Sequence, residues 1–128
     1  MHGERIYSES LYEEKAGFAR ATVVDGWIFV SGTTGFDAET KEFPPDVETQ
    51  CENCFRNIAT ALGKAGASLK DLVRVLIFVT SQDEFERIMP IIRKHCYDAR
   101  PANTTVFAQL VAPHMRVEIE ATARVPRT

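Results

Sequence analysis

The sequence predicts an α+β fold in which two helices cover one face of a mixed β-sheet. Three observations lead to this prediction. Two β-rich runs are joined by Asp25-Gly26, a strong signal for a β-hairpin. Two segments with helical periodicity, 46–64 and 83–97, alternate with strand-like segments. The chain also ends in a run of alternating apolar and polar residues. Its 128 residues fit one domain, spanning 1–128, with a sizeable core.

The N-terminal part is predicted to contribute strands. A short strand is expected around Arg5 to Ser10. The hairpin follows, with strands at Ala21 to Val24 and Trp27 to Ser31. The stretch TTGFDAETKEFPPD is rich in turn-forming residues and is predicted to be a loop that leads into the first helix.

The first helix is predicted to begin after Asp46, which can cap it, to run to Lys64, and to stop at Gly66. Its apolar positions follow the helical period and comprise Val47, Cys51, Cys54, Phe55, Ile58, Ala61, Leu62 and Ala65. The two cysteines are spaced like a metal or redox pair. No second pair with ligand spacing accompanies them, so we interpret them as core residues.

The second helix is predicted from an Asp83 cap to about Tyr97. Pro90 lies inside it and should kink the helix or delay its start. Two final strands follow, Thr104 to Val111 and Arg116 to Val125. In the last strand Val117, Ile119, Ala121 and Ala123 face one way, and Glu118, Glu120, Thr122 and Arg124 face the other.

The strand between the two helices is apolar on both faces. Val73, Val75, Ile77 and Val79 point one way, and Leu76 and Phe78 point the other. Two interpretations of this second pair remain open. If the valine face meets the helices, Leu76 and Phe78 lie on the uncovered sheet face and indicate a subunit interface. If the phase is reversed, they belong to the core.

The composition disfavours several classes of function. The net charge is −3, and the chain has no basic stripe, which argues against a binder of nucleic-acid backbones. No apolar run is long enough to span a bilayer, and the first ten residues lack the apolar section of a secretion signal. We therefore expect a cytoplasmic protein with reduced cysteines and no membrane partner.

Motifs for known chemistry are scarce. The chain has no P-loop, no G-x-G-x-x-G and no nucleophile elbow. Glu118 and Glu120 place two carboxylates on one strand face, which would suit an acid/base pair. Such a pair more often belongs to a solvated or ion-paired strand face. The residues alone do not decide between this interpretation and an acid/base pair.

Three stretches resemble the Rid family of reactive-intermediate deaminases, the YjgF-type proteins: VSGTTG, CFRNIATALGKAGASLKDLVRVLIFVT and RPANTTVFAQLVAPHMRVEIEATA. They occur in order and cover nearly the whole chain. The resemblance implies a chorismate-mutase-like α+β fold and a homotrimer with one small-molecule cleft at each subunit interface. It also implies hydrolysis of reactive enamines and imines to 2-keto acids and ammonia, with no metal and no organic cofactor.

The resemblance assigns several site residues. Glu118, the first acid of VEIE, matches the Glu that positions the attacking water. Ser31 and Gly32 match the Ser-Gly of the pocket wall. Phe18, in AGFARA, matches a Tyr that lines the cleft, and it lacks the hydroxyl group.

The stretch RPANTT departs from the family pattern at its most important position. Asn103 matches the Arg that pairs with the substrate carboxylate, so the loop is present and its charged anchor is absent. Thr104 is assigned to substrate binding beside it. Arg100, on the same loop, has two open interpretations: a surface charge that favours a helix end, or a cation that binds an anionic group from a shifted position. Arg20 and Arg116 are weaker candidates.

Two functions of different classes remain open. The first is a cofactor-independent deaminase that hydrolyses a small imine or enamine, but not the standard 2-imino acids, because the anchoring Arg is missing. The second is a non-catalytic trimer that binds a metabolite as a sensor or accessory protein. A ribonuclease activity is disfavoured by the acidic chain, which lacks a basic stripe with interleaved aromatic residues.

Overall fold

A computed structural model describes residues 3–127. The elements are β1 (Glu4–Ile6), α1 (Leu11–Ala16), β2 (Ala21–Val24), β3 (Trp27–Thr34), α2 (Val47–Lys64), the 3-10 helix η1 (Leu69–Asp71), β4 (Leu72–Val79), α3 (Gln82–Cys96), β5 (Ala102–Phe107) and β6 (Val117–Arg124). The strands form a sheet in the order β1-β2-β3-β6-β4-β5. Only β4 and β5 pair in parallel, which confirms the predicted mixed sheet.

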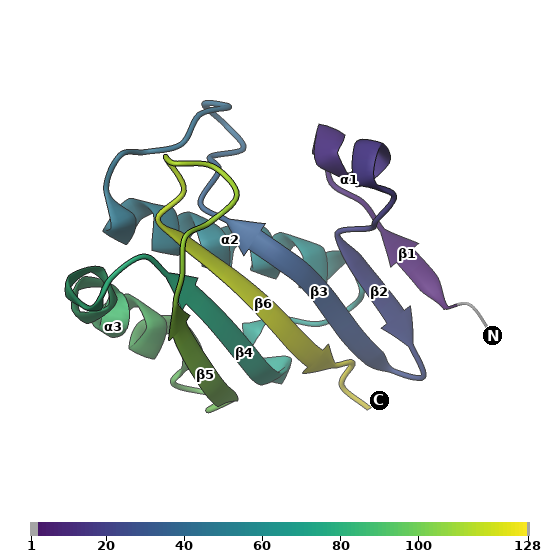
Figure 1. Cartoon of the computed structure of the whole chain (residues 1–128). Coiled ribbons are helices and arrows are strands. Elements are labelled where there is room, and N and C mark those ends of the chain that lie inside the picture. Colours follow the sequence, from purple (N-terminus) through teal and green to yellow (C-terminus); the bar gives the residue numbers. More distant parts are fainter. Residues whose placement is uncertain (1–2, 128) are drawn as a thin grey trace.

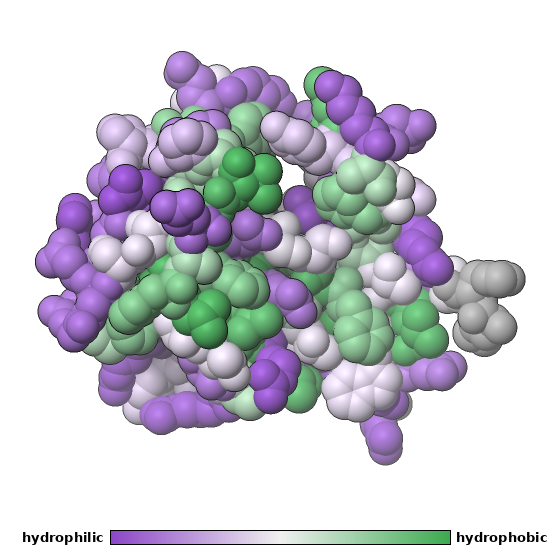
Figure 2. Space-filling model, viewed as in Figure 1, coloured by the Kyte–Doolittle hydropathy of each residue, from purple (hydrophilic) through white to green (hydrophobic). Residues whose placement is uncertain are grey.

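One face of the sheet is covered and the other is open. Helices α2 and α3 lie on the same side, as predicted, and α1 lies apart from them near β1 and β2 (Figure 1). Figure 2 views the open face, where apolar side chains gather over β4 and β5 and over β2 and β3. Leu76 and Phe78 lie on this face and are partly exposed. The reversed phase, which would have put them in the core, is therefore wrong.

The β2–β3 hairpin forms as predicted. Asp25 and Gly26 have φ angles of 53° and 81°, the left-handed conformation that a two-residue turn of this kind requires. β1 is shorter than expected, and α1, which was not predicted, follows it. Ser10 caps this six-residue helix and Gly17 closes it at φ 74°. The helix has six residues, too few to show an apolar period, and its one buried residue is the polar Glu13.

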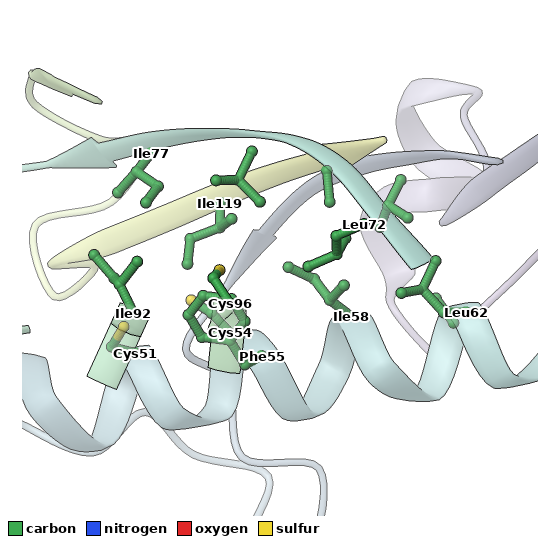
Figure 3. Packing of buried hydrophobic residues seen from close by; sticks show 14 of the residues in the cluster. Cys51, Cys54, Phe55, Ile58, Leu62, Leu72, Ile77, Ile92, Cys96 and Ile119 are labelled. Carbon is green, nitrogen blue, oxygen red and sulfur yellow. The ribbon is translucent and has the colours of Figure 1, made fainter. Parts of the chain in front are cut away.

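Helix α2 holds the centre of the core, as its apolar period predicts. Asp46 accepts a hydrogen bond from the backbone N of Thr49 at 2.8 Å, which confirms the predicted cap. Gly66 takes a left-handed conformation just beyond the cap residue Ala65. Cys51 and Cys54 are buried, free thiols packed against the sheet (Figure 3). Burial raises the pKa of the Cys51 thiol to about 12, which fits a structural role.

The central strand β4 differs from the prediction at one residue. Val75, Ile77 and Val79 are fully buried beneath the helices, but Val73 is 42% exposed. The register of β4 against β6 shifts between Leu72 and Arg74, so Leu72 takes the core position that was expected for Val73. An extra residue at a bulge reverses the facing of the side chains on one side of it.

Helix α3 and the last strands also differ from the prediction at their ends. The cap is Ser81, whose hydroxyl accepts from the backbone N of Glu84, and not Asp83. The helix starts well before Pro90, so the proline does not delay it. β5 begins at Ala102 and stops at Phe107, short of the predicted Val111. In β6 the face with Val117, Ile119, Ala121 and Ala123 is buried, as predicted.

Within residues 3–127, the structure contains no helix that combines the length and the apolar character needed to cross a membrane.

Candidate functional site

Glu118 lies on the open face of the sheet, near the start of β6. It pairs with Thr34 of β3 on one side and with Phe78 of β4 on the other. Gly32 of β3 makes room for its carboxylate, because a Cβ at this position would lie 2.0 Å from Glu118 Oε2. The predicted catalytic carboxylate and the predicted pocket-wall glycine are therefore neighbours.

Ser31 is held in place by the strand beside it. Its backbone N donates to the carbonyl of Arg20 at 2.9 Å, and its hydroxyl donates to the carbonyl of Ala19 at 2.7 Å. These two bonds extend the β2–β3 pairing beyond the ends of β2. Because its hydroxyl proton and its backbone N–H are both used within the hairpin, Ser31 has only oxygen lone pairs to offer a ligand.

Arg20, a weaker candidate in the sequence analysis, is a cation of this face that acts on Glu118. Its Nη2 donates to the Gly32 carbonyl at 2.9 Å, and its Nη1 lies 3.9 Å from Glu13 Oε2. Its Cζ lies 5.9 Å from the centre of the Phe18 ring. Its Nε is buried and has no hydrogen-bond partner in the described part of the chain. Phe18, Gly32 and Glu118 thus share one environment with a guanidinium.

A signal for Arg20 was present in the sequence. A two-residue turn at Asp25-Gly26 fixes the register of the hairpin, so that Ala21 pairs with Val30. One step further, residue 20 stands opposite Ser31. Extending the predicted register beyond the strand would have placed Arg20 beside the Ser-Gly pair.

The electrostatics of this face act on Glu118. Burial raises the pKa of its carboxyl group above the ordinary value of 4.5, Arg20 opposes that shift, and Glu120 adds to it. A carboxyl group with a raised pKa is better matched to proton transfer near neutral pH than an exposed one. Glu120, in contrast, is exposed, so the two acids do not form a matched buried pair.

Glu118→Gln is expected to raise the melting temperature at neutral pH. A carboxyl group whose folded pKa is raised binds protons more tightly in the folded state, so its contribution to stability falls as the pH rises through the interval from 4.5 to the folded pKa. The gain should therefore be present above that interval and vanish below it. Thermal unfolding from about pH 4 to pH 8 measures this. Glu120→Gln is the control and should give a smaller difference; equal effects would contradict burial of Glu118.

The second group of predicted residues lies on the other side of β4, at the sheet edge. Asn103 pairs with Val75 and therefore faces the helices, whereas Thr104 pairs with Leu76 and faces the open side. Asn103 Oδ1 accepts a hydrogen bond from the Thr105 hydroxyl at 2.8 Å. Within a single chain, Asn103 and Thr104 therefore point to opposite faces of the sheet.

Arg100 lies near Asn103 and not near Glu118. Its φ angle is 54°, its Cζ lies 4.2 Å from the centre of the Tyr97 ring, and its Nε donates to the Tyr97 carbonyl at 3.1 Å. Arg100 and Asn103 both line a cavity of about 190 Å³ at the end of α3. The structure thus brings these two together, on the helix side of the sheet.

Arg116, the other weak candidate, forms an ion pair with Glu84. Its Nε donates to Glu84 Oε2 at 2.6 Å, and its Nη2 donates to the other oxygen of the same carboxylate. Burial alone would raise the pKa of Glu84, but the hydrogen bonds from Arg116 and Thr80 lower it overall. Arg116 is therefore engaged in an ion pair that ties the start of β6 to α3.

The predicted site residues form two groups in one chain. Phe18, Ser31, Gly32 and Glu118 lie on the open face at β2, β3 and β6, and Arg100 and Asn103 lie beside β5 on the helix side. β4 separates β6 from β5 in the sheet (Figure 1). Among residues 3–127, no three His, Cys, Asp or Glu side chains are grouped so that they could hold a metal ion.

Comparison with known proteins identifies relatives over almost the full chain. A family model described as Endoribonuclease L-PSP matches residues 9–125. A RutC family protein of Pyrococcus abyssi is 28% identical over 124 residues, covering 96% of this chain and 98% of that protein. The 2-iminobutanoate/2-iminopropanoate deaminase of Dermatophagoides farinae is 27% identical, covering 94% of this chain and 96% of that protein.

A solved structure extends the likeness to three dimensions. Rv2704 of Mycobacterium tuberculosis, described as a member of the highly conserved YjgF/YER057c/UK114 family, superposes with a TM-score of 0.87. It is 33% identical, and the match covers 95% of this chain and 98% of that one. The similarity confirms the YjgF-type fold that the sequence resemblance predicts.

Proposed function

The chain belongs to the Endoribonuclease L-PSP family, which includes the YjgF, RutC and Rid proteins, and from this membership we propose that it binds a small molecule in clefts between the subunits of a homotrimer. The observation that carries the proposal is the division of the predicted site into two groups. Glu118 and Asn103 lie on different faces of the sheet, with β4 between their strands. A cleft that uses both requires β5 of one subunit to meet the open face of another.

The open face has the character of a subunit interface. Phe29 is 50% exposed, Trp27 is 37% exposed and Val106 is 39% exposed. Phe29 and Trp27 pair with Thr122 and Arg124, so they share a face with Glu118 and Glu120. Apolar residues over both halves of this face (Figure 2) would be removed from water in a trimer.

We propose that the reaction is hydrolysis of an imine or enamine. Glu118 takes a proton from a water molecule as the water oxygen bonds to the imine carbon. The proton passes to the nitrogen, which gives a carbinolamine. The hydroxyl proton of the carbinolamine then passes to the nitrogen as the carbon–nitrogen bond breaks, and a carbonyl compound and ammonia leave. The partly buried position of Glu118, and the pKa that burial raises, support this role. These steps use no metal and no organic cofactor.

The substrate class follows from Asn103. An amide at this position carries no charge, and losing a charge-assisted pair to a carboxylate costs about 1.5–3 kcal/mol. That is a factor of roughly ten to a hundred in affinity. We therefore propose a substrate that has no carboxylate on the reacting carbon, unlike the 2-imino acids named for the mite relative.

A non-catalytic trimer that binds a metabolite is the second candidate. Phe18 and Asn103 make the cleft walls more neutral, which suits a ligand of low charge. The name endoribonuclease, which the family model carries, finds no support in the sequence: the net charge is −3, and there is no run of basic residues with interleaved aromatic ones. In either case we expect the protein to act in the cytoplasm.

A coupled deaminase assay distinguishes these functions. An amino-acid oxidase supplies 2-imino acids, and an amine oxidase acting on benzylamine supplies an imine without a carboxylate. We expect wild type to accelerate release of ammonia from the second imine and Glu118→Ala to abolish that acceleration. Asn103→Arg should raise kcat/KM for the 2-imino acids by about ten to a hundredfold. Acceleration of neither imine by wild type would favour the metabolite-binding trimer.

A further inference from the structure

An apolar groove runs between α3 and the edge strand β5. Its volume is about 610 Å³, and its apolar lining residues are Phe85, Met89, Pro90 and Ile92; the polar ones are Glu86, Arg93 and Asn103. Met89 is 44% exposed in it. The groove is large enough for a small organic molecule, and its walls favour an apolar one.

The groove adjoins the smaller cavity near Arg100. Arg93 and Asn103 line both spaces, so the two adjoin at these residues. The smaller cavity adds Tyr97 and Arg100 and has a volume of about 190 Å³. The groove therefore adjoins a cavity that two arginines and an amide line.

The two arginines contact the same aromatic ring. Arg93 Cζ lies 4.6 Å from the centre of the Tyr97 ring, and Arg100 Cζ lies 4.2 Å from it. Neither arginine forms a salt bridge in the described part of the chain. The lining of the smaller cavity includes no carboxylate, so the two guanidinium groups beside it create a positive potential inside it.

The end of α3 does not cancel this potential. The carbonyl groups at a helix C-terminus carry partial negative charge. Here the Cys96 carbonyl accepts from the backbone N of Arg100 at 2.7 Å, and the Tyr97 carbonyl accepts from Arg100 Nε at 3.1 Å. The Nη groups of Arg100 and the whole guanidinium of Arg93 form no hydrogen bond among residues 3–127, so they remain available to a ligand.

We propose that this site binds the carboxylate of a small amphipathic acid, with the carboxylate in the cavity that Arg93 and Arg100 line and the apolar body along the groove beside Phe85 and Met89. Asn103 would donate its amide to the same anion. The inference rests on the proposed function in one respect, that Asn103 belongs to the ligand cleft. It refines the substrate class: the carboxylate is separated from the reacting carbon by an apolar body, instead of being attached to it.

Calorimetric titration tests the site without any chemistry. The probes are 4-phenylbutanoate, its neutral analogue 4-phenylbutanamide, and acetate. Wild type is expected to bind 4-phenylbutanoate more tightly than either of the other two. Arg93→Gln and Arg100→Gln should each weaken binding of 4-phenylbutanoate by at least about tenfold and leave that of the amide unchanged. Met89→Gln should weaken the binding of 4-phenylbutanoate and leave the binding of acetate unchanged.

Arg56→Gln is the matched control, since Arg56 is exposed on α2 and lines neither space. The proposal is wrong if wild type binds the acid no better than the amide, or if Arg56→Gln weakens binding as much as the two site variants do. Because the titration measures affinity alone, a protein that binds the acid but fails the deaminase assay would retain this site and lose the proposed reaction.

Discussion

Replacing Gly35 with Ala is expected to lower the free energy of unfolding by about 3 kcal/mol. An added Cβ would lie 2.4 Å from Gln50 Cβ, 2.5 Å from its Cα and 2.7 Å from its backbone oxygen. These atoms belong to α2, which is packed into the core along its whole apolar face. A flexible side chain could turn away from the new methyl group, but the backbone of a buried helix cannot shift without disturbing the close-packed core around it.

The chain segment around Gly35 is fastened to α2 by side-chain amides. Asn53 Nδ2 donates to the Gly35 carbonyl at 3.1 Å, and Asn57 Nδ2 donates to the Phe36 carbonyl at 2.9 Å. The Cys54 thiol donates to the Thr33 carbonyl at 3.3 Å. Because these bonds satisfy carbonyl groups at the end of β3, a methyl group that pushes the segment outward would also break them.

Gly63→Ala is the matched control for the stability measurement. Gly63 lies inside α2, a Cβ there would meet nothing within 4 Å, and its φ angle is not left-handed. Alanine should therefore stabilise the helix by about 0.5–1 kcal/mol. Urea unfolding of the three proteins measures both effects. If Gly35→Ala were as stable as wild type, the close approach of residue 35 to α2 would be wrong.

Replacing Gly32 with Ala is expected to disturb function far more than stability. The new Cβ would lie 2.0 Å from Glu118 Oε2 and 3.1 Å from Cδ of the same side chain. The carboxylate is the far end of a flexible side chain on an open face, so it can rotate away at little cost to the fold. If Glu118 positions the water in hydrolysis, a displacement of about 1 Å is expected to lower kcat/KM by roughly a hundredfold.

Two readouts separate displacement of Glu118 from general damage. The pKa of Glu118, followed by NMR of its carboxyl carbon, should move when its surroundings change, whether or not the protein is an enzyme. The free energy of unfolding should stay close to that of wild type, and Gly63→Ala should change neither activity nor this pKa. Full activity of Gly32→Ala with an unchanged Glu118 pKa would show that Gly32 does not fix the carboxylate.

Features set by local periodicity were predicted well. The hairpin at Asp25-Gly26, the apolar face of α2 and the alternation in β6 all appear as expected. Each depends on a repeat of about two or 3.6 residues that is visible in a short window. The predictions that were wrong concern segments in which no such repeat exists. α1 is too short, the bulge at Val73 interrupts a period, and Ser81 and Asp83 compete for one cap.

The sequence by itself determined the class of fold, the family and the identity of the changed residue Asn103, because strand alternation, helical period and motif spacing are local properties of the chain. Only the tertiary structure decided which side chains meet. β6, the last strand, inserts between β3 and β4, and the parallel pairing of β5 with β4 turns Asn103 toward α3 and Thr104 away from it. These pairings join segments far apart in sequence, so the facing of Asn103, the neighbourhood of Arg20 and the two-arginine cavity follow from contacts that no short stretch of sequence encodes.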